Sequence, residues 1–565
     1  MKDAKQTDNS SSSIQIYSKT SDGHSKIGNF IDSFKRADQT ETTSDLENGK
    51  EVIYSPLEQN LKDRHIQMIA IAGCVGLGLF ISQGSALATS GPGGLVISYS
   101  VIGLLLYFIV QSLGQLTSAF PVQGNFLVYN VRFIDESWGF AMNWNYCFQW
   151  LVTLPLSLVS ASLTIQFWGS SINPVVWVAI FYVIIVAINI FGIKGYGEAE
   201  FIFSLIKVIA IVGFCIFAII VVAGAGEQGY IGGRFWHNPG TFSHGFKGVC
   251  SVFVNAAFSF AGTELCALAA AESKNPRRAL TKAIKQVFWR IIIFYMLSTI
   301  MICFLVPYDD PKLLSNSSTS ASPFVVAIQN SGTKVLPSIF NVVILIAVLS
   351  VANASVYASY RPLVSLAHAG HGPKILKYVD RNGRPLVALL VTLLIGLLGF
   401  VSASPKQETV FNWLLALSGL STIFTWFSIS LAHIRVTYAF KIQGVPLNQF
   451  PFRATGNTLG AYFSLVINIL VLIAQFYVGL YPVDGKEKDI ATFLQVYLAA
   501  PVVLVFYLGH KIWTRNWKLY VRAEEMDITT DRLMVDIDMY KQLLTDEKQV
   551  WESKPWYYRL YHTWC

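Results

Sequence analysis

The chain has 565 residues, of which 53% are hydrophobic, 14% aromatic and only 13% charged. This composition disfavours a soluble globular protein, and the apolar residues lie in blocks long enough to cross a membrane, which takes about 20 residues per helix. The net charge of +8 does not indicate nucleic-acid binding, because no basic groove with interleaved aromatic residues lies outside the apolar blocks.

Residues 1–60 are polar and rich in Ser, Thr, Asp and Lys, and they contain no cleavable signal peptide. We expect them to form a disordered tail, because such a segment buries too little apolar surface to order itself. Without a signal peptide, the amino end is expected to stay in the cytosol.

Twelve long apolar runs follow, and each predicts a transmembrane helix. The predicted fold class is therefore an all-α polytopic membrane protein, with a transporter domain over residues 61–513. The predicted spans are 67–89, 94–119, 138–166, 174–194, 199–224, 247–272, 286–307, 335–359, 385–404, 409–433, 458–481 and 489–513.

Lys and Arg concentrate in the loops that face the same side as the amino end, for example at Arg277 and Arg278. Because positively charged short loops stay inside, this bias predicts an even number of spans with both termini cytosolic. The loop 308–334 is then outside and contains Asn316 in an Asn-Ser-Ser triplet, a glycosylation candidate whose occupancy stays open.

Three glycines, Gly73, Gly76 and Gly78, interrupt the first span, and each costs about 1 kcal/mol of helix propensity relative to Ala. We expect the backbone to unwind near Gly76. Unsatisfied backbone groups cost several kcal/mol in hydrocarbon, so the break is tolerable only where it lines a cavity. The alternative is that these glycines serve tight helix crossings.

A second interruption is expected at residues 258–264, where Gly262 and Glu264 lie inside an apolar run. The spans divide into repeats at about 67–224 and 247–437, each beginning with a broken helix, while spans 11 and 12 (458–513) lie outside the repeat. Five spans per repeat invert the second half, the arrangement used for alternating access in secondary transporters.

The segment 514–565 is predicted to be a cytosolic tail with an amphipathic helix from about Ala523 to Lys554. Cys565, the last residue, follows an aromatic and basic stretch and is a candidate for S-acylation, with an ordinary exposed thiol as the alternative. The other six cysteines lie in apolar runs without paired metal spacing, so they are interpreted as buried apolar residues and no metal or cofactor is expected. No GxSxG, HExxH, Walker or paired-carboxylate motif indicates an enzyme.

Several motifs together resemble the fungal amino acid permease family of the amino acid/polyamine/organocation superfamily, over roughly residues 60–565. They are HIQMIAIAG from His65, GLGLF from Gly76, FPVQGNF from Phe120, RFIDESWGFAMNWNY from Arg132, QWLVTLPL from Gln149, IKVIAIVGF from Ile206, GFKGV from Gly245, FSFAGTEL from Phe258, AAAESKNPRRA from Ala269, KQVFWRIIIFY from Lys285 and the closing WC. The resemblance implies the fold of bacterial sodium-coupled amino acid transporters (LeuT-like), a fungal plasma membrane, and uptake of amino acids with protons.

A zwitterionic amino acid needs donors for its carboxylate and acceptors for its ammonium. The half-helix beginning near Leu77 is expected to direct its N–H groups at the carboxylate, with Gly76 and Gly78 allowing close approach. Carbonyls around Phe258, Ser259 and Ala261 are expected to accept from the ammonium. The resemblance implies that the Phe258 ring closes over the substrate; a packing role is the alternative.

Two ionisable residues lie inside predicted spans and need a reason. The resemblance implies that Lys207 replaces a sodium ion and contacts span 1; the alternative is snorkelling to an inner interface marked by Glu198 and Glu200. Glu264 either carries a proton during the cycle or holds the unwound segment in shape.

Two positions depart from the family pattern, since relatives often have Glu where this chain has Gln115 and Ser157. Neither replacement exchanges a proton near neutral pH, which puts the usual proton route in doubt. Loss of an acidic pocket residue favours neutral amino acids as substrates. The competing hypothesis is an amino acid sensor of the same fold that binds without transporting.

Overall fold

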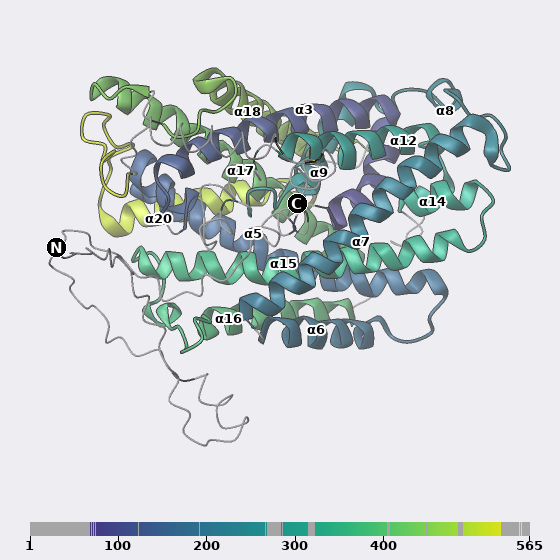
Figure 1. The fold of residues 1–565 in the computed structure, drawn as a ribbon, viewed down its shortest axis with the longest axis horizontal. Helices are drawn as coiled ribbons and strands as arrows, with labels where there is room; N and C mark the ends of the chain where they lie inside the picture. Colours follow the sequence, from purple (N-terminus) through teal and green to yellow (C-terminus); the bar gives the residue numbers. More distant parts are fainter. Residues whose placement is uncertain are drawn as a thin grey trace, which may run out of the picture.

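The computed structural model describes residues 75–532 except 123, 191, 266, 268–283, 285, 315–321, 404–406, 448–449 and 484–489, and also Lys35, Met68, Ile71, Gly73, Ser553 and Pro555. The described residues therefore exclude Asn316, Cys565 and, apart from Lys35, the whole of the predicted disordered tail (1–60). Within the described part, the chain folds as a bundle of helices that run along one common direction (Figure 1).

Eleven α-helices form the body of the bundle. They are α3 (Gln83–Ala119), α5 (Glu136–Ile165), α6 (Pro174–Ile190), α7 (Gly192–Ile220), α9 (Gly245–Phe260), α12 (Ser298–Leu305), α15 (Leu336–His368), α16 (Leu386–Gly396), α17 (Gln407–Ile442), α18 (Asn457–Leu480) and α20 (Ala499–Thr514). The shorter elements are η1 (Gly78–Ser82), α4 (Phe126–Tyr129), η2 (Asn130–Ile134), η3 (Gln166–Trp168), η4 (Val221–Ala225), α8 (Arg234–His237), η5 (Ile291–Leu297), α13 (Pro311–Leu314), α14 (Pro323–Asn330), η6 (Lys374–Lys377), η7 (Leu397–Ala403) and α19 (Ile490–Tyr497).

Among the described residues, 7 helices are long and apolar enough to cross a membrane. They span Gly78–Ala119, Glu136–Trp168, Gly195–Ala225, Gln286–Leu305, Leu336–His368, Val410–Ile442 and Asn457–Leu480, and shorter apolar helices cover Pro174–Ile190, Gly245–Phe260 and Leu386–Val401. The all-helical, multi-span class that the composition predicts is confirmed at this level.

The first two predicted spans form two helical pieces that meet at Gly91, where the backbone leaves the helical conformation. Gly91 has φ +74°, and Pro92 supplies no N–H at the next position. The groups freed by the interruption pair with the loop before α9: Gly93 N donates to the Thr241 carbonyl at 2.9 Å, and Ser243 N donates to the Ser90 carbonyl at 3.2 Å. The backbone groups at this junction therefore remain bonded although the helix is interrupted.

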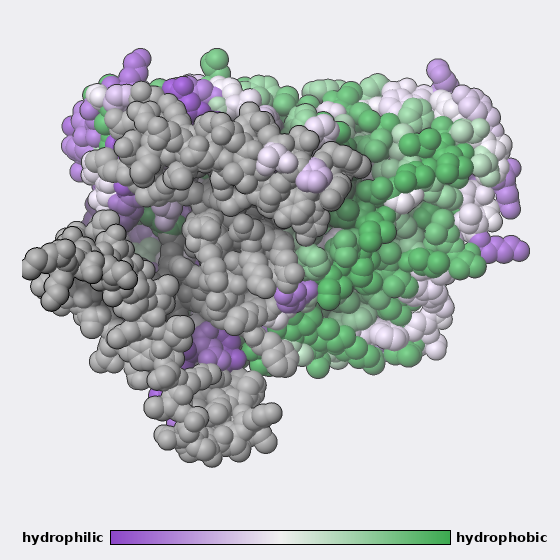
Figure 2. Space-filling view, in the orientation of Figure 1, coloured by the Kyte–Doolittle hydropathy of each residue, from purple (hydrophilic) through white to green (hydrophobic). Residues whose placement is uncertain are grey.

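Burial separates the central helices from the peripheral ones. In the most apolar 18-residue stretch of the α5 span, 89% of the residues are buried, whereas in the corresponding stretches of the α7 and α18 spans 33% are buried. Side chains such as Val183, Ile209 and Ile473 on the outer helices are more than half exposed. Figure 2 shows the corresponding apolar surface, which suits contact with lipid acyl chains.

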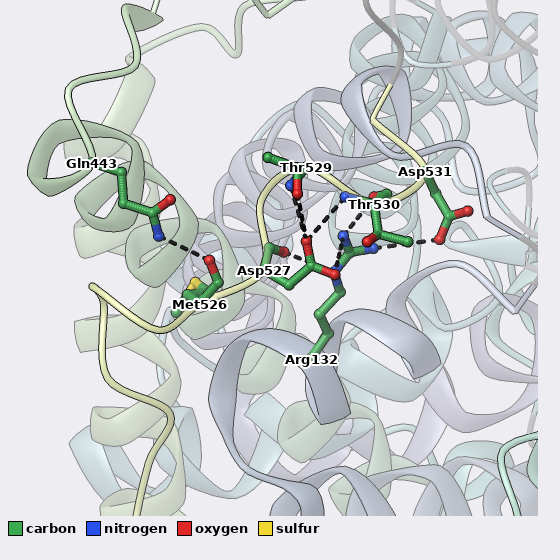
Figure 3. Close-up of polar contacts among 7 residues, drawn as sticks. All are labelled: Arg132, Gln443, Met526, Asp527, Thr529, Thr530 and Asp531. Atoms are coloured by element: carbon green, nitrogen blue, oxygen red, sulfur yellow. Dashed lines mark hydrogen bonds and ion pairs between the residues drawn. The ribbon is translucent and has the colours of Figure 1, made fainter.

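Residues 515–532 pack against one end of the bundle, which we call the tail face (Figure 3). Arg132 Nε donates to the Asp527 carbonyl at 2.8 Å, and the guanidinium lies 3.1 Å from the Asp527 carboxylate. Gln443 Nε2 donates to the Met526 carbonyl at 2.8 Å, and the Met526 and Ile528 side chains are buried. The predicted amphipathic helix is therefore wrong for residues 523–532, which form turns held by these contacts; residues 533–552 lie outside the described part.

Four of the six cysteines predicted to be buried apolar residues, Cys147, Cys215, Cys250 and Cys303, are free and buried, which confirms that interpretation for them. Cys74 and Cys266 lie outside the described residues.

Candidate functional site

The first helix is interrupted between Gly73 and Gly76. Val75 N donates to the Ile71 carbonyl at 2.9 Å, which ends the first helical piece, and Phe80 N donates to the Gly76 carbonyl at 2.9 Å, which begins the next. Residues 73, 75 and 76 lie in turns and bends, and η1 then starts the second piece. The amides of its first turn point towards the gap because they have no preceding helical turn to bond.

The second interruption lies at residues 261–264. Helix α9 ends at Phe260, Ala261 turns away with ψ 146°, and Gly262 has φ +94°, a conformation that favours glycine. The Gly262 N–H faces both carboxylate oxygens of Glu264, each at 3.2 Å. This geometry is the one expected if Glu264 holds the unwound segment in shape; proton carriage by Glu264 stays a prediction.

The two interruptions pack backbone against backbone. A Cβ added to Gly262 would lie 2.7 Å from the Gly73 carbonyl oxygen, and one added to Gly78 would lie 2.3 Å from Ser259 Cα. A Cβ on Gly76 would lie 2.1 Å from Val351 Cγ2 on α15. These glycines therefore do serve tight crossings, as the alternative held, and close approach of a ligand to Gly76 and Gly78 stays a prediction.

A small cavity of about 10 Å³ lies between the interruptions, with room for about one water molecule. Its lining includes Leu77, Gly78, Phe258 and Ala261 among the predicted binding residues, and it adds Gly73, Gln149, Trp150, Thr153, Val351 and Ser418. Gly76 and Ser259 are not part of the lining. The cavity thus brings four of the six predicted residues together.

Ser259 has partners other than a ligand. Its carbonyl accepts from the Tyr295 hydroxyl at 2.9 Å, and its Oγ lies 2.9 Å from the Tyr99 hydroxyl and donates to the Asn255 carbonyl. The predicted role of this carbonyl as an ammonium acceptor would require it to accept a second hydrogen bond beside the one from Tyr295.

The wall contributed by α5 carries polar atoms that sequence reasoning did not assign to the site. Gln149 Oε1 and Trp150 Nε1 are buried, and no described residue pairs with them. Thr153 Oγ1 donates to the Gln149 carbonyl at 2.7 Å and lies 3.1 Å from Ser418 Oγ. Gln149, Trp150 and Thr153 belong to the QWLVTLPL motif. Its polar residues lie within an apolar span, and this pattern could have indicated a binding site.

Lys207 is fully buried on α7 and lies in a polar network, so the snorkelling alternative is wrong. Its Nζ donates to Ser350 Oγ on α15 at 2.8 Å, and Ser350 Oγ donates to Glu200 Oε2 at 2.6 Å. Asn353 Nδ2 donates to Glu200 Oε1 at 2.6 Å. Glu200 is also fully buried and so marks no interface, whereas Glu198 is exposed.

Gln115 and Ser157, the two positions where relatives often have Glu, have different surroundings. Gln115 Oε1 accepts from Ala454 N at 2.9 Å, so this amide anchors the loop before α18. Ser157 is fully buried one turn beyond Thr153, and its Oγ donates to the Thr153 carbonyl at 2.8 Å. Ser157 therefore lies next to the cavity wall, whereas Gln115 has a structural partner away from the cavity lining.

Sequence comparison places the chain among known proteins. Residues 65–523 match the family "Amino acid permease". General amino-acid permease GAP2 of Candida albicans is 52% identical over 546 residues, covering 95% of this chain and 93% of the relative. General amino-acid permease GAP1 of Saccharomyces cerevisiae is 51% identical (96% and 92% covered), and the histidine permease of the same yeast is 45% identical (99% and 94%). By the extent and identity of these matches, the chain belongs to the amino acid permease family.

Proposed function

We propose that this integral membrane protein takes up amino acids across the plasma membrane by alternating access, coupled to protons. The observation that carries the proposal is the cavity between the two helix interruptions. Its lining includes Leu77, Gln149 and Trp150, and no described residue pairs with the buried Gln149 Oε1 and Trp150 Nε1. Donors and acceptors gathered in a water-poor site are what a zwitterion requires.

Twelve spans in a LeuT-like inverted repeat form part of this proposal. Support comes from the positions of the interruptions, which fall in the first span of each predicted half. Both termini are placed in the cytosol by the charge bias of the loops. Alternating access would then move one repeat element against another around the central site.

The cavity is too small for an amino acid, so it must widen before a substrate can bind. Phe258 is 6% exposed and lines the cavity, and substrate entry requires its ring or the neighbouring Leu77 and Trp150 to move. Return of these side chains over a bound substrate would exclude water and strengthen polar contacts to the ligand.

Neutral amino acids are the proposed substrates. Among the described residues, those that line the cavity include no Asp, Glu, Lys or Arg, and the position where relatives often have Glu is Ser157. A cationic side chain would be left unpaired in such a site, at a considerable desolvation cost. The relatives named general amino-acid permeases make a broad neutral range the working hypothesis.

Proton coupling is assigned to the Lys207–Ser350–Glu200 network. Two ionisable groups share one hydroxyl in a fully buried setting, so a proton gained or lost by either changes the net charge of the network. Ser350 precedes Val351, which lines the cavity and contacts Gly76. Displacement of α15 by substrate would therefore reach the network directly.

Uptake by purified protein in liposomes tests the proposal. We expect a labelled neutral amino acid to accumulate faster when the outside is acidic than when the two sides have the same pH. Uptake that is equal under both conditions, with an active relative responding in parallel, contradicts the coupling. Binding of the amino acid without any uptake indicates the sensor instead.

A further inference from the structure

Three metal-ligating side chains meet at the tail face and share no residue with the cavity. Glu136 lies in the first turn of α5, His371 follows the end of α15, and His510 lies near the end of α20. One ligand atom from each lies within 4.8 Å of the other two. None of the three takes part in the proposed transport cycle.

The His510 ring is held in place by two contacts. Its Nδ1 lies 2.9 Å from Ser137 Oγ, and the Phe140 ring stacks on it with centroids 4.5 Å apart. A hydrogen bond at one ring nitrogen fixes the tautomer and leaves the other nitrogen to bind a metal, as at metal-ligating histidines. Nε2 of His510 is thus available as a ligand atom.

The His371 ring has no direct hydrogen-bond partner among the described residues. Its Nδ1 is buried and unpaired, and its Nε2 is 3.9 Å from Glu136 Oε1, which is too long for a hydrogen bond. The backbone at this position is nevertheless anchored, since Trp144 Nε1 donates to the His371 carbonyl at 3.1 Å. An imidazole that lacks a hydrogen-bond partner among the described residues, beside a carboxylate and a second imidazole, is suited to bind a metal ion.

We propose that Glu136, His371 and His510 bind a zinc ion, with water as the fourth ligand. Two imidazoles and a carboxylate form a known zinc donor set, while Mg²⁺ and Ca²⁺ prefer oxygen ligands only. Donors on a tetrahedral zinc ion lie about 3.4 Å apart, so the three atoms must converge slightly. The Glu136 side chain is 51% exposed and is free to make this movement.

Zinc at this position would tie together the start of α5, the segment after α15 and the end of α20. The end of α20 also carries Lys511, whose Nζ donates to Asp135 Oδ1 at 2.9 Å, so the metal would reinforce a contact between the same two helices. The expected consequence is higher stability of the folded bundle, because a ligand that binds only the folded state stabilises it.

The test uses the full chain in detergent micelles, purified with a tag that lacks histidine and treated with a chelator. We expect calorimetric titration with Zn²⁺ to show one tight equivalent per chain, and Co²⁺ to give the visible absorption of a tetrahedral complex. Zn²⁺ should raise the unfolding temperature. Glu136→Gln, His371→Asn and His510→Asn should each weaken Zn²⁺ binding at least tenfold and remove the thermal response.

His237→Asn is the matched control, since His237 is exposed on α8, outside the cluster. It should bind Zn²⁺ as the wild type does. The unfolding temperature without metal shows whether each variant is folded, and a folded variant that has lost the Zn²⁺ response supports the site. Absence of binding at micromolar Zn²⁺, or unchanged binding by the double variant His371→Asn/His510→Asn, would overturn the proposal, whatever the outcome of the uptake experiment.

Discussion

Lys207 and Glu200 lie on the same helix, α7, and are joined through one hydroxyl of α15, that of Ser350. Both side chains are fully buried, so neither has water to solvate its charge. Ser350 contacts both members of the pair, and Asn353, also on α15, donates to Glu200, so the relative position of α7 and α15 determines whether these contacts form.

Replacing one member of this pair should destabilise the folded protein more than replacing both. Glu200→Gln or Lys207→Met leaves the other ionisable group buried without its charged partner. Breaking a buried pair in this way lowers the free energy of unfolding by about 3–5 kcal/mol. The double variant should recover part of this stability, because no unpaired charge remains. Unfolding temperatures in detergent measure the stabilities, and strictly additive losses would contradict a shared network.

The same variants should separate stability from coupling. We expect the double variant to fold and to bind amino acid but to show the same uptake with and without a proton gradient. A double variant that still responds to the gradient would place coupling elsewhere, with Glu264 as the next candidate.

Gly262→Ala should abolish uptake and lower the unfolding temperature. The added Cβ would lie 2.7 Å from the Gly73 carbonyl, at a residue with φ +94°. Overpacking of this kind costs about 1–3 kcal/mol, besides the strain of a left-handed conformation. The control is Gly169→Ala, also at positive φ (+68°) but with nothing within 4 Å, which should cost about 1 kcal/mol and leave uptake intact. Equal effects of the two variants would exclude the close backbone contact as the cause.

Gln149→Leu should impair transport without destabilising the fold. Gln149 Oε1 is buried and unpaired, so an apolar replacement removes an unfavourable burial and should leave the unfolding temperature unchanged or raised. Loss of one substrate hydrogen bond should increase KM for uptake about tenfold. Gln115→Leu is the matched control: its amide accepts from Ala454 N, so stability should fall while KM stays unchanged. A reversed pattern would show that Gln149 is structural.

Docking of the tail should be insensitive to pH across the physiological range. Burial tends to raise the pKa of Asp527, but hydrogen bonds from Thr530 and Thr529 and the charge of Arg132 outweigh it, so the pKa lies well below its usual value. A depressed carboxyl pKa contributes stability above its unfolded value of about 4, and this contribution is lost as pH falls through the folded pKa. Trypsin cleavage near Arg522 should therefore stay slow from about pH 5 to 8 and become fast in Asp527→Asn. Release of the tail near neutral pH would contradict this assignment.

The sequence alone determined the class of protein and the positions of its two interruptions. Apolar runs predict helices because lipid offers no partner for backbone groups, and glycines within such runs predict breaks for the same reason. These arguments are local, and they placed the two interruptions close to where they lie, at residues 73–76 and 261–264. The bounds are narrower than predicted, since Gly78 lies in η1 and Phe258–Phe260 still belong to α9. The motif-level resemblance to amino acid permeases was likewise readable from short ordered segments and is confirmed by the comparisons.

Only the tertiary structure decided which groups meet. Gln149 and Trp150 join the cavity, Glu200 joins Lys207 through Ser350, and Glu136, His371 and His510 converge at the tail face, although each set is scattered along the chain. Likewise, the glycines proved to lie against the backbone of Ser259 and the side chain of Val351, a crossing that spacing cannot reveal. The physical reason is that helical periodicity reports which face of a helix is buried but carries no information on which helix covers that face.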